Sequence, residues 1–166
     1  MRMVSSSAPE LDDFDWAILA LLQQNNTIPQ RSIGEAVHLS AASVQRRIRR
    51  LETSGIIQAN QAVLNPDRVG QPLTLLVEIT IESEQAALVD AAKASFAAAP
   101  EVQQCYYVTG EADFVLVVTT ASMQAYEALT RRLFFDNPNV KRFRTLVVMD
   151  RVKVSLTVPL PISQAG

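Results

Sequence analysis

The segment LSAASVQRRIRRLETSG, residues 39–55, decides the fold of the first part of the chain. Val44, Ile48 and Leu51 recur at the spacing that places side chains on one face of a helix. Ser40 is a favourable N-cap residue, and Gly55 is typical of the position that follows a helix end. The pattern predicts a helix over about residues 40–53, with one face directed to a hydrophobic core.

The opposite face of this helix concentrates positive charge. Four arginines fall within five positions, and no acidic residue occurs between Glu35 and Glu52. A face that is merely solvated is the alternative, but such faces usually mix signs, because opposite charges at i,i+4 stabilise a helix. The net charge of the chain is −2, so nucleic-acid binding would have to come from this local patch. We interpret the face as one that meets phosphates.

Two shorter amphipathic segments precede this helix. The stretch LDDFDWAILALLQQ, residues 11–24, predicts a helix capped by Asp12 or Asp13. Its predicted inward face comprises Leu11, Phe14, Ile18, Leu21 and Leu22, broadened by Trp16 and Leu19. The stretch PQRSIGEAV, residues 29–37, predicts a second helix that begins at a proline, and residues 38–39 form the turn that follows. Together the three segments predict a helix-turn-helix.

After residue 55 the sequence predicts a wing and then a linker. The stretch IIQANQAVLN, residues 56–65, contains two short pieces with strand character, which predict the wing of a winged helix-turn-helix. The stretch NPDRVGQP, residues 65–72, contains two prolines and a glycine and predicts a linker.

From Leu73 onward the apolar period falls to two, which predicts a strand over residues 73–82 with alternate residues buried. A helix is predicted over residues 84–99, with Leu88, Ala92, Phe96 and Ala99 inward. Two strands joined by a tight turn at residues 110–112, a helix and a last strand follow; they span residues 102–109, 113–120, 122–136 and 140–154. The order βαββαβ predicts a ferredoxin-like sandwich, so the fold class is α+β. Its open face exposes Leu76, Val115 and Val117, which favours a homodimer.

Composition narrows the possible functions. The chain has 166 residues, of which 48% are apolar, so it can bury a sizeable core. One cysteine, Cys105, and one histidine, His38, leave no internal disulfide, no cysteine-based metal site and no plausible Ser-His-Asp triad, and we expect no cofactor or metal. The first ten residues lack an apolar stretch, and no segment has the length of a membrane span, so we expect a cytoplasmic protein without a membrane partner.

The predicted domain boundaries follow from these patterns. Residues 1–10 are a flexible start, 11–64 the winged helix-turn-helix, and 65–72 the linker. Residues 73–160 are the ferredoxin-like domain and 161–166 a tail.

Five motifs are dispersed along the chain: LDDFDWAIL at 11–19, LSAASVQRRIRRLETSGII at 39–57, PEV at 100–102, VTGEADF at 108–114 and RTLVVMDRVK at 144–153. Together they resemble the Lrp/AsnC (leucine-responsive and asparagine-responsive, or feast/famine) family of transcription regulators. The resemblance implies a DNA-binding winged helix-turn-helix joined to an effector-binding RAM domain. It also implies dimers that form through the sheets and often a higher even oligomer such as an octamer.

The position of each side chain along the arginine-rich helix predicts whether it contacts phosphates, contacts bases or has a structural role. Arg46, Arg49 and Arg50 are predicted to neutralise phosphates, whereas Arg47 lies nearer the apolar stripe and is predicted to be structural. The first turn and a half is placed to meet base edges, as in a recognition helix. The remaining predicted DNA-binding residues are Ser40, Ala41, Ala42, Ser43 and Gln45.

The resemblance places an effector, commonly an amino acid, at the VTGEAD loop between dimers. Amides around Gly110 suit a carboxylate, and Asp113 suits an ammonium group. The predicted effector-binding residues are Thr109, Gly110, Glu111, Asp113 and Thr145. The alternative is a tight turn with exposed acids.

Four positions depart from the family pattern. Gly34 stands where alanine is usual, which predicts a second helix weakened by about 1 kcal/mol. His38 stands where glycine is frequent in the turn, Asn60 where tyrosine is common in the wing, and Ala112 where an aromatic residue is frequent.

The sequence thus predicts a sequence-specific DNA-binding regulator that responds to an amino acid or a related metabolite, and not an enzyme. Two alternatives remain: a tetrapyrrole-pathway decarboxylase of the same layout, and a ligand-sensing scaffold that does not bind DNA. The decarboxylase would need proton donors near its substrate, and His38 is the chain's single histidine.

Overall fold

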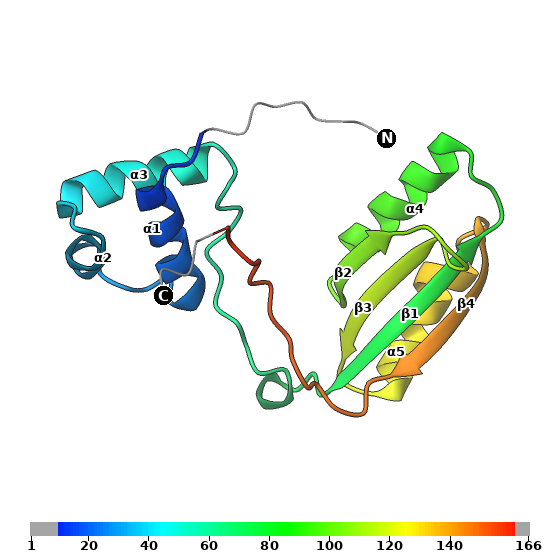
Figure 1. Ribbon diagram of the computed structural model, residues 1–166. Coiled ribbons are helices and arrows are strands. Elements are labelled where there is room, and N and C mark those ends of the chain that lie inside the picture. Colours follow the sequence, from blue (N-terminus) through cyan, green and yellow to red (C-terminus); the bar gives the residue numbers. More distant parts are fainter. Residues whose placement is uncertain (1–9, 162–166) are drawn as a thin grey trace. The chain divides into compact units, whose positions relative to one another are not determined.

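The computed structural model describes residues 10–161, which divide into two compact units (Figure 1). Unit 1 consists of residues 10–62 together with 154–161, and unit 2 is Val63–Lys153. Within the described part of the chain, no helix is long and apolar enough to cross a membrane.

Unit 1 contains the three predicted helices, α1 (Asp13–Gln24), α2 (Gln30–Val37) and α3 (Ala41–Thr53). The α1 and α3 helices begin at the predicted N-caps, because the side chains of Asp12 and Ser40 each accept a backbone N–H of the first turn. The buried core of the three helices consists of Ile18, Ile33, Val37 and Val44. The helix-turn-helix is confirmed.

The turn between α2 and α3 leaves no room for a side chain at Gly34. His38 has a left-handed backbone with φ 57°, and the N–H of Leu39 donates to the carbonyl of Gly34 at 2.9 Å. A Cβ atom on Gly34 would lie well inside the van der Waals contact distance from the Leu39 carbonyl oxygen. The expectation that Gly34 merely weakens α2 is therefore incomplete, because the turn itself requires this glycine.

The predicted wing does not form in the described residues: no strand occurs over residues 56–65. The N–H groups of Ile56 and Ile57 both donate to the carbonyl of Leu51 and complete the end of α3. The chain then continues without a partner strand, and a lone strand has nothing to satisfy its backbone groups.

The inward face of α1 also differs from the prediction. Phe14 is 42% exposed, whereas Asp15 is fully buried beside Ile18. A buried acid takes the inward position because cations from α3 reach it, as described below.

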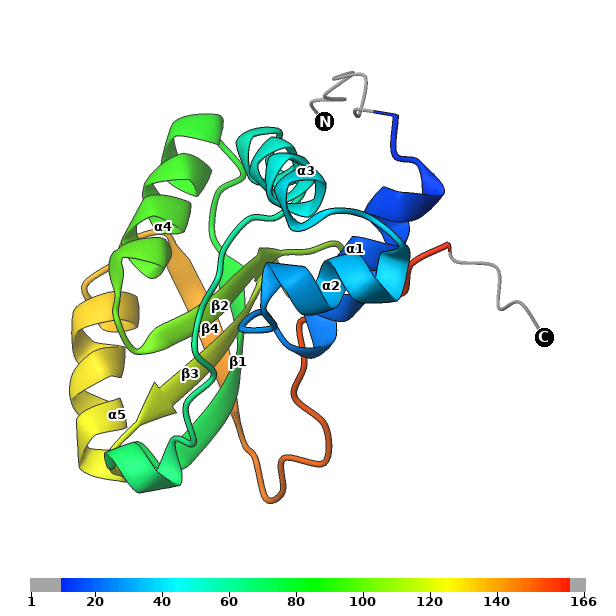
Figure 2. The ribbon, with the colours of Figure 1, turned by 90° about the vertical axis from the view of Figure 1, so that its left-hand side faces the viewer.

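Unit 2 has the predicted βαββαβ order, and its fold class is confirmed. Its elements are β1 (Leu73–Ile81), α4 (Ala86–Ala98), β2 (Val102–Tyr107), β3 (Phe114–Thr120), α5 (Met123–Thr130) and β4 (Val140–Val147). The sheet is antiparallel with the order β2-β3-β1-β4, so β3 and β1 are its central strands. Helices α4 and α5 cover one face of this sheet (Figures 1 and 2).

The core of unit 2 lies between the sheet and these two helices. Leu75, Val77 and Ile79 of β1 are fully buried, which confirms the alternation. The helix α4 contributes Val89 and Phe96, whereas Leu88, predicted to point inward, is 38% exposed. The face that meets the sheet is formed by Val89, Ala92 and Phe96 at i, i+3 and i+7. Val89 therefore takes the inward position that was predicted for Leu88.

Two elements of unit 2 end differently from the prediction. After α5, a π-helical turn at Arg131–Phe135 buries Phe134 and leaves Phe135 exposed. The last strand ends at Val147 and not at residue 154, because Val147 pairs with Leu75 at the start of β1. After Val147, the N–H of Val148 donates one more hydrogen bond, to the carbonyl of Thr74. Beyond that point β1 has ended, so the described residues that follow have no strand to pair with.

A row of apolar side chains crosses the other face of the sheet. Val117, Leu76 and Leu146 are neighbours in the strand register, and no helix of unit 2 covers them. Leu76, Val115 and Val117 are half-buried, and Leu146 is exposed.

Candidate nucleic-acid interface and effector loop

The first turn of α3 presents small and neutral side chains to solvent. Ala41, Ala42 and Gln45 are exposed, and Ser43 is half-buried. The hydroxyl of Ser40 accepts the N–H of Ser43 at 3.2 Å, so Ser40 serves as the cap. Short side chains at this end let the helix backbone approach another surface closely.

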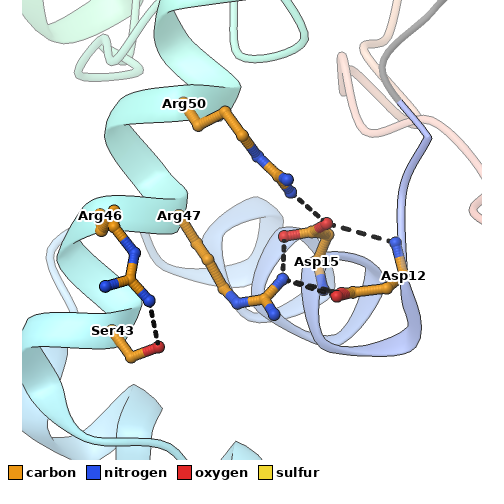
Figure 3. Close-up of polar contacts among 6 residues, drawn as sticks. All are labelled: Asp12, Asp15, Ser43, Arg46, Arg47 and Arg50. Atoms are coloured by element: carbon orange, nitrogen blue, oxygen red, sulfur yellow. Dashed lines mark hydrogen bonds and ion pairs between the residues drawn. The ribbon is translucent and has the colours of Figure 1, made fainter.

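The four arginines of α3 fall into two groups (Figure 3 draws three of them). Arg46 and Arg49 are exposed and form no ion pair with any described residue. Arg46 has one weak contact, with the Ser43 hydroxyl at 3.5 Å. These two side chains carry charge that nothing in the described part of the chain neutralises.

Arg47 and Arg50 point instead toward the start of α1 (Figure 3). The Nη1 atom of Arg47 lies 2.8 Å from Oδ1 of Asp15 and 2.9 Å from both carboxylate oxygens of Asp12. Its guanidinium also lies 5.3 Å from the ring centre of Phe14. The hydrogen bond to Asp15 holds the pKa of Arg47 above its usual value. The predicted structural position of Arg47 is confirmed.

Arg50 donates through Nη2 to Oδ2 of Asp15, although its side chain remains 48% exposed. The sequence prediction grouped Arg50 with the phosphate-binding arginines and did not foresee this contact. The signal that was available is Asp15 itself, an acid three positions before Ile18 in the apolar stripe of α1. An acid at such a position needs a cation, because a buried charge without a partner is strongly destabilising.

Acidification is expected to weaken unit 1 through Asp12. The hydrogen bond from the Asp15 N–H, and then Arg47, lower the pKa of Asp12 below its usual value of 3.8. The unfolded chain therefore binds this proton first, so the stabilisation is present above about pH 4 and is lost as the pH falls below it toward the lowered pKa. Trp16 is the only tryptophan in the sequence. Denaturant unfolding followed by its fluorescence at several pH values measures the free energy of unfolding of unit 1.

The Asp12→Asn variant is the control, because asparagine also caps a helix but carries no charge. The free energy of unfolding of the wild-type chain should fall more steeply than that of the variant between about pH 5 and about pH 3. Parallel curves would contradict the assignment.

The VTGEAD loop is longer than the predicted tight turn and spans residues 108–113. Asp113 anchors it, because one carboxylate oxygen accepts the N–H of Ile81 and its carbonyl accepts the N–H of Val108, both at 2.8 Å. Gly110 has φ 130°, and a Cβ atom there would meet nothing within 4 Å. A larger residue would strain this backbone without clashing with the described chain.

A hollow on the open face of the sheet begins at this loop. Its lining includes Glu78, Thr80, Glu111, Ala112, Arg142 and Arg144. Arg144 pairs with Glu78 at 2.6 Å, and the Nε of Arg142 donates to the Thr80 hydroxyl at 3.2 Å. Arg142 forms no ion pair with a described residue, so the hollow combines a free cation with the carboxylate of Glu111.

The structure does not bring Thr145 into this hollow. Thr145 follows Arg144 on β4 and therefore points to the helix-covered face, where its hydroxyl hydrogen-bonds that of Tyr126. Arg142, which the sequence pattern did not single out, also lines this hollow. The available signal was its alternation with Arg144 on the solvent-facing positions of the last strand.

Comparisons with known proteins cover both units. The AsnC-type helix-turn-helix domain matches residues 11–52, and the Lrp/AsnC ligand binding domain matches residues 74–158. The chain belongs to the Lrp/AsnC family. The resemblance inferred from the dispersed motifs is confirmed.

Relatives in the Lrp/AsnC family are similar over nearly the whole chain. An HTH-type transcriptional regulator from Sinorhizobium fredii is 44% identical and covers 97% of this chain and 95% of its own length. The leucine-responsive regulatory protein of Escherichia coli K12 is 34% identical over 88% of this chain and 89% of its own.

Solved structures show the same similarity. A transcriptional regulator from Neisseria meningitidis, crystallised as a complex with L-Met, aligns with a TM-score of 0.84 and 28% identity over 92% of this chain and 98% of its own. The leucine response regulatory protein of Mycobacterium tuberculosis aligns with a TM-score of 0.77 and 33% identity over 87% and 96%. This Lrp/AsnC chain is accordingly a transcriptional regulator with a DNA-binding helix-turn-helix and a ligand-binding domain.

Proposed function

We propose that this Lrp/AsnC regulator binds duplex DNA through the exposed arc of α3 and changes its DNA binding when unit 2 binds an amino acid. The observation that carries the proposal is the pair of exposed arginines, Arg46 and Arg49, beside a first turn of small side chains. Such a helix matches a major groove, where arginines contact phosphates and short residues allow close approach.

In the DNA complex, side chains of the first turn and a half of α3 meet base edges. These are Ala41, Ala42, Ser43 and Gln45, with Ser40 fixing the start of the helix. Arg46 and Arg49, in the following turn, bind the flanking phosphates and set the register of the helix on the duplex.

The effector is an α-amino acid held at the hollow beside the VTGEAD loop. Arg142 suits its carboxylate and Glu111 its ammonium group. The other predicted contacts, Thr109, Gly110 and Asp113, belong to the same loop as Glu111. The Neisseria meningitidis relative, crystallised with L-Met, supports this class of ligand. Thr145, committed to Tyr126 on the other face, is left out of the site.

The working assembly is a homodimer, and a higher even oligomer such as an octamer, built on the open sheet face. The uncovered row of Val117, Leu76 and Leu146 supports it, because burying apolar area stabilises an interface. A two-fold dimer presents two α3 helices to half-sites about 34 Å apart or a multiple of that distance. Light scattering at micromolar concentration tests this, and a monomer would refute it.

Two measurements test the proposal. Fluorescence anisotropy with a labelled random-sequence duplex of about 30 base pairs, over a salt series, detects DNA binding and its electrostatic part. Calorimetry with each common amino acid detects the effector. An absence of duplex binding refutes the first half of the proposal, and an absence of any amino-acid binding refutes the second.

For an amino acid that binds, Arg142→Gln is expected to weaken affinity by about tenfold or more, because a charge-assisted hydrogen bond to the carboxylate is lost. Arg131→Gln is the matched control, since Arg131 is an exposed arginine of the same unit that pairs with Glu127 outside the hollow. Equal affinities of the two variants would contradict the placement of the carboxylate.

A further inference from the structure

The buried carboxylate of Asp15 binds two of the four arginines of α3 and leaves the other two unbound. Its side chain is 0% exposed, and both oxygens are used. Oδ1 accepts from Arg47 at 2.8 Å, and Oδ2 accepts from Arg50 and from the backbone N–H of Asp12 at 3.2 Å. Asp12, the N-cap of α1, and Asp15 within α1 thus balance two of the four positive charges on α3.

We propose that Asp15 is a positioning residue for DNA binding: it holds Arg47 and Arg50 against α1 and leaves the phosphate contacts of α3 to Arg46 and Arg49. This inference rests on the proposed DNA-binding function. It changes the role of Arg50, which the sequence placed among the phosphate-binding residues.

The energetic reason is an asymmetry between the two partners available to Arg50. A DNA phosphate is solvated and has other cations, whereas Asp15 is fully buried. Transferring Arg50 to a phosphate would leave a buried carboxylate with one cation fewer, and an underpaired buried charge is far more destabilising than an exposed contact is stabilising. Arg47 is held still more firmly, because it also contacts Asp12 and the ring of Phe14.

The same contacts fix the orientation of α3. Arg47 and Arg50 lie one turn apart on one side of the helix, and Asp15 lies 32 and 35 positions earlier in the chain. Binding both arginines to one carboxylate prevents α3 from rotating about its axis. The arc that carries Arg46 and Arg49 therefore keeps a constant direction.

The test is the salt dependence of binding of the full-length chain to a labelled random-sequence duplex of about 30 base pairs. Each phosphate contact contributes about 0.9 to the slope of log K against log salt concentration. We expect Arg46→Ala to reduce the slope by about 0.9 for each protomer bound, and Arg50→Ala to leave it unchanged. A reduction by Arg50→Ala equal to that by Arg46→Ala would overturn the proposal.

The Asp15→Asn variant tests the carboxylate directly. Without its negative charge, Arg50 is released toward solvent, and the slope is expected to rise by up to about 0.9 per protomer. The double variant Asp15→Asn/Arg50→Ala should return to the wild-type slope. A purely structural role of Asp15 would lower the melting temperature without this pattern.

Asp13→Asn is the matched control, because Asp13 is an exposed acid of the same helix that forms no ion pair with a described residue. If Asp13→Asn raises the slope as much as Asp15→Asn does, the effect is one of net charge and the proposal fails. Should Asp15→Asn not fold, the comparison of Arg46→Ala with Arg50→Ala decides alone. A wild-type chain that does not bind the duplex refutes the proposed function itself, which is a distinguishable outcome.

Discussion

Replacing Arg46 and Arg49 together by alanine is expected to remove most of the affinity for duplex DNA. Both side chains are exposed and without an ion pair among the described residues, so phosphates can take them without breaking an existing contact. Two lost contacts lower the salt slope by about 1.8 per protomer and the binding constant by on the order of thirtyfold at about 0.15 M salt. The folded structure should be unchanged, because neither side chain reaches the core.

Anisotropy titrations at several salt concentrations measure both quantities. The double variant Arg131→Ala/Arg132→Ala serves as the control, since it removes two exposed arginines from unit 2 and changes the net charge by the same amount. The proposed interface is supported if the control variant binds the duplex as tightly as the wild type does and the Arg46→Ala/Arg49→Ala variant binds it more weakly. Wild-type affinity and slope in the Arg46→Ala/Arg49→Ala variant would show that α3 does not bind phosphates.

The Gly34→Ala variant is expected to lose about 1–3 kcal/mol of stability in unit 1. Alanine is intrinsically a better helix residue by about 1 kcal/mol, so helix propensity alone predicts the opposite sign. The clash decides the sign, because the new methyl group would meet the backbone oxygen of Leu39, which cannot rotate away as a side chain can. The turn into α3 would have to open to relieve it.

Denaturant unfolding followed by the fluorescence of Trp16 in α1 reports this loss from unit 1. His38→Gly is a useful companion, because glycine adopts the left-handed conformation of residue 38 without strain, and this variant should be at least as stable as the wild type. A Gly34→Ala variant as stable as the wild type would mean that the turn adapts easily.

The starts of helices α1 and α3 and the buried face of β1 follow from the sequence alone. Ser40 and Asp12 each cap the helix that the pattern placed after them, and the alternation in β1 identifies its buried face. These features depend on residues within a few positions of one another. The order of the elements and the spacing of the motifs were also sufficient to identify the Lrp/AsnC family.

The tertiary structure decided what depends on distant segments. Asp15 lies more than thirty positions from the arginines that neutralise it, so the sequence shows an acid and four cations but not which of them meet. The end of β4 is set by the start of β1, and no pattern within residues 140–154 marks it. Arg142 reaches the hollow because β4 lies beside β1, and Gly34 is required because Leu39 folds back over it. In each case the deciding contact joins groups whose proximity exists only after folding.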